Sequence, residues 1–279
     1  MNNYIKKILY LGPDGSNSQF AAALFMEKLG IKPEMEAVST ITKAIEMLDI
    51  EPDTTAAILP VENSIEGVVR ETIDNLVHTK SDVFIQAEIT VPICHCLISK
   101  GKNKENIKTI VSITQAIAQC KNYIANNFKK DVEILLYTST SGSAKFIADK
   151  DETYACIASE LCAHLYGLNI IEKEINDVKD NKTRFILVSK KNILKDKKRR
   201  TSIAFTTENK PGALLSILEI FKKYNLNLLY LESRPSKKVF GEYIFYADID
   251  KGIDDIQEAL GEIKVKCTYN RILGSYCVL

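Results

Sequence analysis

The feature that most constrains the fold is an alternation of two apolar patterns over the first 190 residues. Short strand-like apolar runs cover residues 8–11, 56–59, 83–97, 109–113, 134–137, 155–158 and 183–189. Between them, apolar residues recur at helical spacing: Phe20, Leu24, Phe25 and Leu29; Ile41, Ala44, Ile45 and Leu48; and Ala116, Ile117, Cys120, Tyr123 and Ile124. A further helix is expected over 68–77. This alternation predicts α/β layers with largely parallel sheets.

The long extended stretch 83–97, which Pro92 is expected to interrupt, points to a chain that crosses between two lobes. About 190 residues are enough for two small α/β lobes with a cleft between them. Ligands of such folds bind at the carboxyl ends of strands and against helix N-termini.

A sharp change in composition marks residues 190–200, where seven residues are Lys or Arg. Such a cluster could bind nucleic acid, but it lacks interleaved aromatic residues, so a solvated linker is favoured. We therefore divide the chain into residues 1–190, a basic linker at 191–200, and residues 201–279.

The pattern after the linker differs from the pattern before it. Strands are expected at 201–206, 227–233, 242–248 and 263–273, and helices at 212–224 and 253–261. This βαββαβ order predicts a ferredoxin-like domain, with a small sheet covered by two helices. Because such domains often pair edge to edge, we expect a homo-oligomer.

Charge and composition exclude several classes of protein. The formal net charge is +1, so no global basicity favours nucleic acid as a partner. The seven scattered cysteines are typical of reduced thiols in a cytoplasm, and residues 1–7 do not resemble a secretory signal. No apolar run is long enough to span a membrane. A soluble cytoplasmic protein is expected.

Metal and triad chemistry are not favoured either. Cys94, His95 and Cys96 are adjacent, but no second Cys/His pair lies at a zinc spacing. None of the three histidines lies beside a nucleophile and an acid as in a hydrolase triad. No metal ion is expected.

Three hydroxyl-rich or amide-rich turns each follow a strand and precede a helix, at residues 12–18, 60–67 and 137–144. Ser16 or Ser18 can cap the first helix, whose N-terminal amides favour an anion. Glu62, Asn63 and Ser64 leave the end of a strand. Each turn alone could be simple capping, but together they predict a pocket for a small, anionic, oxygen-rich molecule.

Thr183, Arg184 and Phe185 open the last strand of this part. Arg can bind a carboxylate through two parallel hydrogen bonds, and Thr adds a compact donor. Alternation along a strand places Thr183 and Phe185 on one face and Arg184 on the other. Arg184 could equally form a structural ion pair, and the tripeptide by itself does not decide.

Taken together, these motifs resemble the prephenate dehydratase family with a C-terminal ACT regulatory domain. The resemblance rests on an ordered set of motifs along nearly the whole chain: residues 12–16, 62–67, 95–97, Gln115-Ala116, Gln119-Cys120, Thr140, Ala144, 166–168, 181–185, 212–214, 232–235 and 273–276. Two positions depart from the family pattern. Asn17 replaces an aromatic or bulky residue, and Ile113-Thr114 replaces His-Pro.

The resemblance implies a two-lobed catalytic part like that of periplasmic binding proteins, without a cofactor. It implies a carbon–oxygen lyase that converts prephenate to phenylpyruvate in L-phenylalanine biosynthesis. It also implies feedback control by L-phenylalanine at the ACT domain, and assembly as a homodimer or homotetramer. Because no chorismate mutase pattern precedes the first strand, the monofunctional form is expected.

The resemblance also assigns roles to residues. Thr183 is the expected catalytic hydroxyl, and Glu62 or an ordered water is a candidate proton relay. The expected substrate-binding residues are Ser16, Asn63, Ser64, Thr140, Arg184 and Phe185. The expected effector-binding residues are Gly212, Ala213, Leu214, Glu232, Ser233 and Arg234.

Three alternatives remain open. One is an arogenate dehydratase, which performs the same chemistry on the aminated substrate. Another is a non-catalytic sensor of amino acids or carboxylates with a binding-protein fold. The third is a nucleic-acid binder that uses residues 190–200.

Overall fold

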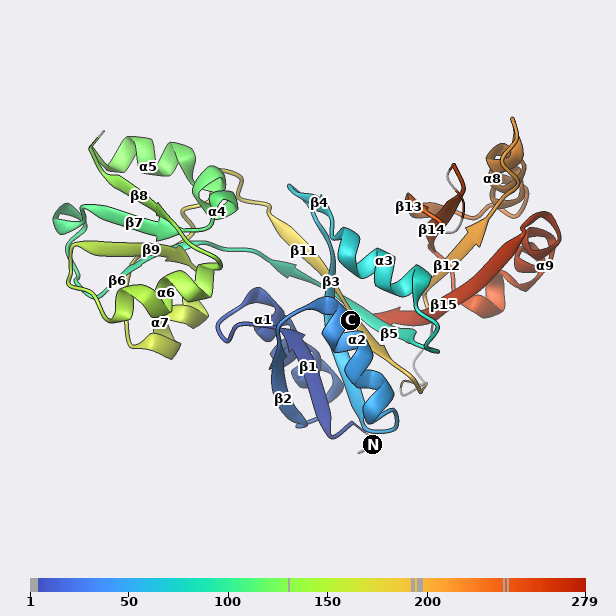
Figure 1. Cartoon of the computed structure of the whole chain (residues 1–279), viewed down its shortest axis with the longest axis horizontal. Helices are drawn as coiled ribbons and strands as arrows, with labels where there is room; N and C mark the ends of the chain where they lie inside the picture. Colours follow the sequence, from blue (N-terminus) through green and yellow to red (C-terminus); the bar gives the residue numbers. More distant parts are fainter. Residues whose placement is uncertain (1–4, 130, 192–193, 195–197, 238, 240) are drawn as a thin grey trace.

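The computed structural model describes residues 5–129, 131–191, 194, 198–237, 239 and 241–279. A ten-stranded sheet in two connected parts runs through the molecule (Figure 1), in the order β13-β14-β12-β15-β5-β11-β3-β1-β2, with β4 paired to β3. Its strands in the first lobe are β1 (Lys7–Leu11), β2 (Glu34–Val38), β3 (Thr55–Asn63), β4 (Gly67–Val68), β5 (Phe84–Pro92) and β11 (Lys182–Ser189). The helices α2 (Ile41–Ile50) and α3 (Arg70–His78) pack on one face, and α1 (Asn17–Leu29) packs on the other.

The second lobe is a separate five-stranded sheet in the order β10-β6-β9-β7-β8. Its strands are β6 (Cys96–Ser99), β7 (Thr109–Ser112), β8 (Glu133–Leu136), β9 (Tyr154–Ala158) and β10 (Asn169–Glu172), with a short 3-10 helix η1 (Lys104–Asn106). The helices α4 (Thr114–Gln119) and α5 (Lys121–Asn127) cover one face, and α6 (Thr140–Ala148) and α7 (Glu160–Tyr166) cover the other.

The two lobes are joined by two antiparallel segments, β5 outward and β11 on the return (Figure 1). The expected break near Pro92 is confirmed, because β5 ends there and β6 begins at Cys96. The expectation of largely parallel sheets is only partly right. β1 runs parallel to β2 and β3, and β7 runs parallel to β8 and β9, whereas β11 is antiparallel to both its neighbours.

The C-terminal part has the expected βαββαβ order: β12 (Arg200–Thr206), α8 (Ala213–Lys223), β13 (Leu228–Pro235), β14 (Tyr243–Ile249), α9 (Gln257–Lys266) and β15 (Tyr269–Val278), with a 3-10 turn η2 (Ile253–Asp255) before α9. The expected strand at 263–273 is displaced. Ile263 is buried in the helix α9, so the apolar run that predicted a strand is shared between a helix and a strand.

Other elements differ from the sequence prediction or lie outside the described residues. The helical stripe at 116–124 is divided into α4 and α5 at Cys120. The strands β2 and β10 were not predicted, because their partly polar sequences carry no clear apolar run. Much of the expected basic linker at 191–200, namely residues 192–193 and 195–197, lies outside the described residues.

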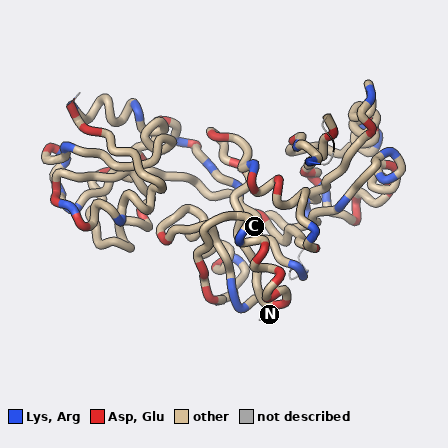
Figure 2. The backbone as a smooth tube through the Cα atoms, in the orientation of Figure 1, with Lys and Arg blue, Asp and Glu red and all other residues tan. Residues whose placement is uncertain are grey.

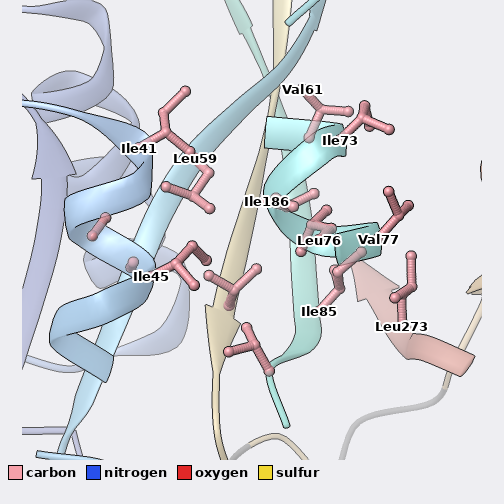
Figure 3. Packing of buried hydrophobic residues seen from close by; sticks show 14 of the residues in the cluster. Ile41, Ile45, Leu59, Val61, Ile73, Leu76, Val77, Ile85, Ile186 and Leu273 are labelled. Atoms are coloured by element: carbon pink, nitrogen blue, oxygen red, sulfur yellow. The ribbon is translucent and has the colours of Figure 1, made fainter. Parts of the chain in front are cut away.

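One hydrophobic core extends from the first lobe into the C-terminal part. It includes Leu59 of β3, Leu76 of α3, and Tyr246 and Leu273 of the C-terminal sheet. Figure 3 shows Leu273 beside Val77 of α3. The last residues of β15 also pair in parallel with β5. The C-terminal sheet is therefore packed directly onto the lobe that carries β11.

The close approach of β15 to β5 requires a glycine. A Cβ atom added at Gly274 would lie 2.4 Å from the backbone oxygen of Ile85. We expect Gly274→Ala to cost about 1–3 kcal/mol of stability, because two backbones would have to separate. Gly261→Ala in α9 is the matched control, since its new methyl group would meet nothing within 4 Å. Thermal unfolding of both variants would test this, and equal midpoints would contradict it.

Charges of both signs are interspersed over both lobes and the C-terminal part (Figure 2). Among the helices in the described ranges, none combines the length and apolarity needed to cross a membrane.

Candidate active site

A cavity of about 360 Å³ lies between the two lobes. Residues from both lobes and from the connecting segments line it: Asn17, Asn63, Glu66, Gly67, Val68, Val69, Ile93, His95, Ile113, Gln115, Ala116, Gln119, Thr140, Asn181 and Thr183. Three of the expected site residues, Asn63, Thr140 and Thr183, are therefore brought together from segments far apart in the sequence.

Thr183 lies near the start of β11, paired with Asn63 at the end of β3. Its hydroxyl oxygen accepts a hydrogen bond from Nδ2 of Asn63, at 2.9 Å. The orientation of the Asn63 amide is fixed, because its Oδ1 accepts hydrogen bonds from the backbone N–H groups of Ile65 and Glu66, each at 3.0 Å. Exchanging its oxygen and nitrogen would lose both bonds. Since the Thr183 oxygen already accepts a bond, its own O–H is left to donate into the cavity.

Two helix N-termini face this cavity from opposite lobes. Asn17 is the first residue of α1, which Ser16 caps by accepting a bond from the Gln19 amide at 3.2 Å. Thr140 is the first residue of α6, capped in the same way by Ser139. Helix N-termini present free amides and a partial positive charge, which favour anions. Ser16 itself does not line the cavity, because its hydroxyl donates to the Leu11 carbonyl at 2.8 Å.

Sequence reasoning gave no role to several residues that line the cavity. Gln119, Asn181 and Glu66 were noted only within turns or family motifs, and His95 only within a family motif and as a disfavoured metal ligand. His95 is buried, and burial lowers the pKa of its imidazole, so the ring is neutral near pH 7. The signal that could have found these residues was their polarity at the ends of strands and helices that border the cleft.

Arg184 and Phe185 do not line the cavity, which differs from the sequence expectation. The Phe185 side chain is 1% exposed and packs in the core beneath α1. Arg184 points to the opposite face of β11 from Thr183, as strand alternation requires. Its Nη1 lies 2.6 Å from Asp248 of β14 and 3.2 Å from Glu88 of β5. The open question about Arg184 is thus answered by an ion pair.

The environment of Arg184 is buried and charged. Burial opposes the charge, but the combined attraction of Asp248, Glu88 and neighbouring groups outweighs it and raises the pKa of the guanidinium above its usual value. Glu62, the expected proton relay, also lies on this side, with Oε2 3.7 Å from Nε of Arg184. Ser64 is exposed and donates to the Asp180 carbonyl at 3.4 Å. Neither Glu62 nor Ser64 lines the cavity.

The expected effector residues are divided between two faces of the C-terminal part. Gly212, Ala213 and Leu214 form the start of α8, with Gly212 in a left-handed conformation at φ 81°. In β13, Arg234 forms a two-bond ion pair with Asp74 of α3, at 2.7 and 2.9 Å. Glu232 lies on the same face, 3.8 Å from Arg234, and Ser233 is exposed.

No group of three or more His, Cys, Asp or Glu side chains within the described residues is arranged to hold a metal ion. All seven cysteines are unpaired thiols. Cys94 is exposed and Cys96 is buried, so these two thiols do not share one environment.

Comparison with known proteins decides the family. The sequence model described as prephenate dehydratase matches residues 8–193. The chain belongs to the prephenate dehydratase family. The model of the ACT domain matches residues 201–267, so the C-terminal βαββαβ part is an ACT domain.

Relatives extend this prephenate dehydratase match over the whole chain. The prephenate dehydratase of Methanocaldococcus jannaschii is 39% identical over 277 residues, which cover 98% of each chain. An Arabidopsis thaliana protein named arogenate dehydratase/prephenate dehydratase 2 is 33% identical, over 98% of this chain and 73% of its own length. Among solved structures, the prephenate dehydratase of Arthrobacter aurescens in complex with L-Phe has a TM-score of 0.87 and 30% identity, covering 97% of this chain and 90% of its own.

Proposed function

We propose that the protein converts prephenate to phenylpyruvate, carbon dioxide and water in the cavity between the lobes. The observation that carries this proposal is the Thr183 hydroxyl, which lines that cavity and accepts a hydrogen bond from Asn63. We infer that its own O–H donates into the cavity. The family and the relatives named prephenate dehydratase support the same reaction.

The chemistry requires little beyond positioning and proton transfer. As the ring carboxylate leaves as carbon dioxide, its bonding electrons move through the ring and expel the para hydroxyl, which leaves as water after gaining one proton. The leaving group accepts the electrons, so no cofactor is needed as an electron sink. We assign to Thr183 the hydrogen bond to the departing oxygen, while solvent supplies the net proton.

The two substrate carboxylates need partners other than Arg184. None of the described residues that line the cavity is Lys or Arg. We propose that the starts of α1 and α6, at Asn17 and Thr140, bind the carboxylates through backbone amides and the helix dipole. A dianion held at two helix starts from opposite lobes would also draw the lobes together.

A turnover assay tests the reaction. Phenylpyruvate formation should be detected by ultraviolet absorbance when the purified protein is given prephenate. No turnover by a folded protein would favour the alternative of a non-catalytic carboxylate sensor. Arogenate is the substrate to compare, because Glu66 offers the cavity a carboxylate that could bind its amino group, and the Arabidopsis relative carries both names. A higher kcat/KM with arogenate than with prephenate would make the protein an arogenate dehydratase.

We further propose that L-phenylalanine binds the ACT domain and lowers activity. The proposed site comprises the start of α8, at Gly212, Ala213 and Leu214, together with Ser233 of β13. Glu232 and Arg234 lie on the other face of β13, toward α3, and would transmit the effect of binding. The L-Phe complex of the Arthrobacter relative supports the choice of effector. Arg234 contacts Asp74 of α3, whose N-terminal side leads back to the cavity residues Val68 and Val69.

L-Phenylalanine should bind in calorimetry and reduce prephenate turnover, while L-alanine at the same concentration should do neither. A coupling of about 1–3 kcal/mol corresponds to an affinity change of about 5- to 150-fold between effector and substrate. Absence of binding heat over a range of temperatures would remove the regulatory proposal.

Domain limits, assembly and location remain proposals. We propose a catalytic part at 1–190, a linker at 191–200 and the ACT domain at 201–279. We propose a homodimer or homotetramer, because the edge strand β13 exposes Leu229 and Leu231. The free cysteines support a cytoplasmic location. Light scattering over a range of concentrations would give the oligomeric state.

A further inference from the structure

A chain of side-chain hydrogen bonds connects Thr183 to other residues that line the cavity. Nδ2 of Asn63, which donates to Thr183 at 2.9 Å, also donates to Oδ1 of Asn181 at 2.7 Å; the Lys182 carbonyl, at 3.1 Å, is a more distant acceptor for the same two N–H groups. Nδ2 of Asn181 donates to Oε1 of Gln119 at 3.1 Å. Nε2 of His95 lies 3.0 Å from that same Gln119 oxygen. Thr183 is thus connected to His95 through three amide side chains.

The direction of every bond in this chain is determined at both ends. At one end, the backbone amides of residues 65 and 66 require Oδ1 of Asn63 to be the acceptor, so Nδ2 must donate. At the other end, Nε2 of Gln119 donates to the carboxylate of Glu66 at 2.8 Å, so Oε1 must accept. The two ends agree on the orientation of Asn181 between them. Nε2 of His95 must therefore carry a proton.

His95 is held rigidly for this task. Its backbone N–H donates to Oδ1 of Asn176 at 2.6 Å, and its carbonyl accepts the Ile175 amide at 3.0 Å. The side chain is buried, at 6% exposure. A fixed donor on a neutral ring orients the Gln119 carbonyl without adding a charge beside an anionic substrate.

The bond between Glu66 and Gln119 crosses the cleft. Glu66 lies in the turn between β3 and β4 of the first lobe, and Gln119 ends α4 of the second lobe. On another contact between the lobes, the Ser159 hydroxyl donates to the Gly15 carbonyl at 2.9 Å. If the lobes separate, the bond from Gln119 to Glu66 breaks, and the Gln119 amide loses the partner that fixes its Nε2.

We infer that His95 and Glu66 are positioning residues that hold Gln119 from opposite sides of the cleft, and that through Asn181 and Asn63 they keep the Thr183 O–H directed into the cavity. This inference rests on the proposed role of Thr183 as hydrogen-bond donor. It makes the complete chain a property of the closed cleft, because the Gln119–Glu66 bond joins the two lobes.

The first test separates the donor function of His95 from its volume. His95→Gln retains an N–H donor, whereas His95→Leu has similar bulk and none. We expect His95→Leu to lower kcat about ten- to a hundredfold with KM changed less than about threefold, and His95→Gln to retain kcat within about fivefold, on the scale of one lost hydrogen bond in a buried site. His164→Leu, at an exposed histidine, is the control and should be unchanged. Equal losses in the Leu and Gln variants, or no loss in His95→Leu, would overturn the inference.

The second test exchanges donor and acceptor across the cleft. Gln119→Glu places two carboxylates side by side and removes the bond to Glu66, so kcat should fall about ten- to a hundredfold. Adding Glu66→Gln restores a donor facing an acceptor, because Gln at position 66 can donate to the new carboxylate, and kcat should recover to within about fivefold of the wild type. A folded double variant that stays as slow as Gln119→Glu would overturn the inference.

A double-mutant comparison distinguishes this inference from the proposed function. If the chain acts through Thr183, His95→Leu should cause little further loss in a Thr183→Ala background. Additive losses would show that His95 acts independently of Thr183 and would overturn the inference alone. Normal turnover by Thr183→Ala would instead overturn the proposed role of Thr183.

Discussion

Thr183→Ala should lower kcat for prephenate by about a hundred- to ten-thousandfold, the usual contribution of a positioned acid–base group. The side chain is 8% exposed and its methyl group can be replaced by water or by slight relaxation, so the fold should be kept. The lost group is the only part of Thr183 that can donate to the departing oxygen. Asn63 would remain in place through its bonds to residues 65 and 66.

Thr183→Ser is the matched control, because it keeps the hydroxyl and removes only a methyl group. Its kcat should stay within about tenfold of the wild type. Steady-state assays, with circular dichroism to confirm folding, would measure both variants. A folded Thr183→Ala protein with near-normal turnover would show that another group assists the leaving oxygen.

Asp248→Ala should destabilise the protein by about 3–5 kcal/mol, the cost of removing one partner from a buried ion pair. Asp248 is fully buried in β14, where it pairs with Arg184 and accepts a bond from Ser202 at 2.5 Å. Without Asp248, the Arg184 guanidinium keeps Glu88 but loses its closest partner. Its Nε and Nη2 are already buried without a hydrogen bond in the described structure.

Asp250→Ala, at an exposed position just after the same strand, is the control and should change stability by less than about 0.5 kcal/mol. A double variant, Asp248→Leu with Arg184→Met, should recover much of the loss, because replacing both charges with apolar groups avoids an unpaired buried charge. Urea unfolding followed by circular dichroism would compare the three. Equal stabilities of Asp248→Ala and Asp250→Ala would contradict the role of this pair.

Because Arg184 is adjacent to Thr183 on β11, the ion pair links the ACT sheet to the strand that carries the proposed catalytic hydroxyl. The opposite faces of these two residues follow from strand geometry, which the sequence alone predicted. What no local pattern could show is that the face of Arg184 meets the ACT domain. Asp248 is separated from Arg184 by 64 residues, and no motif connects them.

The same contrast holds for the cavity. The strand-to-helix turns that carry Asn63 and Thr140 were found from hydroxyls and amides after apolar runs, because backbone groups at these ends need partners and ligands use them. The placement of His95, Gln119 and Asn181 was not found, because their contacts join segments up to 118 residues apart. The displaced strand at 263–273 has a different cause: its apolar residues suit either a helix or a strand, and the packing of Ile263 in the ACT core favours the helix.

By itself, then, the sequence determined the alternation of strands and helices, the two-lobed plan and the βαββαβ order of the C-terminal part, since these depend on the period of apolar residues. The ACT domain and the proposed role of Thr183 followed from short motifs that resemble those of a known family. Only the tertiary structure decided which face of each strand borders the cleft, that Arg184 forms an ion pair with Asp248, and that the Gln119 amide connects the lobes. The physical reason is that burial and hydrogen-bond direction depend on groups distant along the chain, which come together only once both lobes and the ACT sheet have packed.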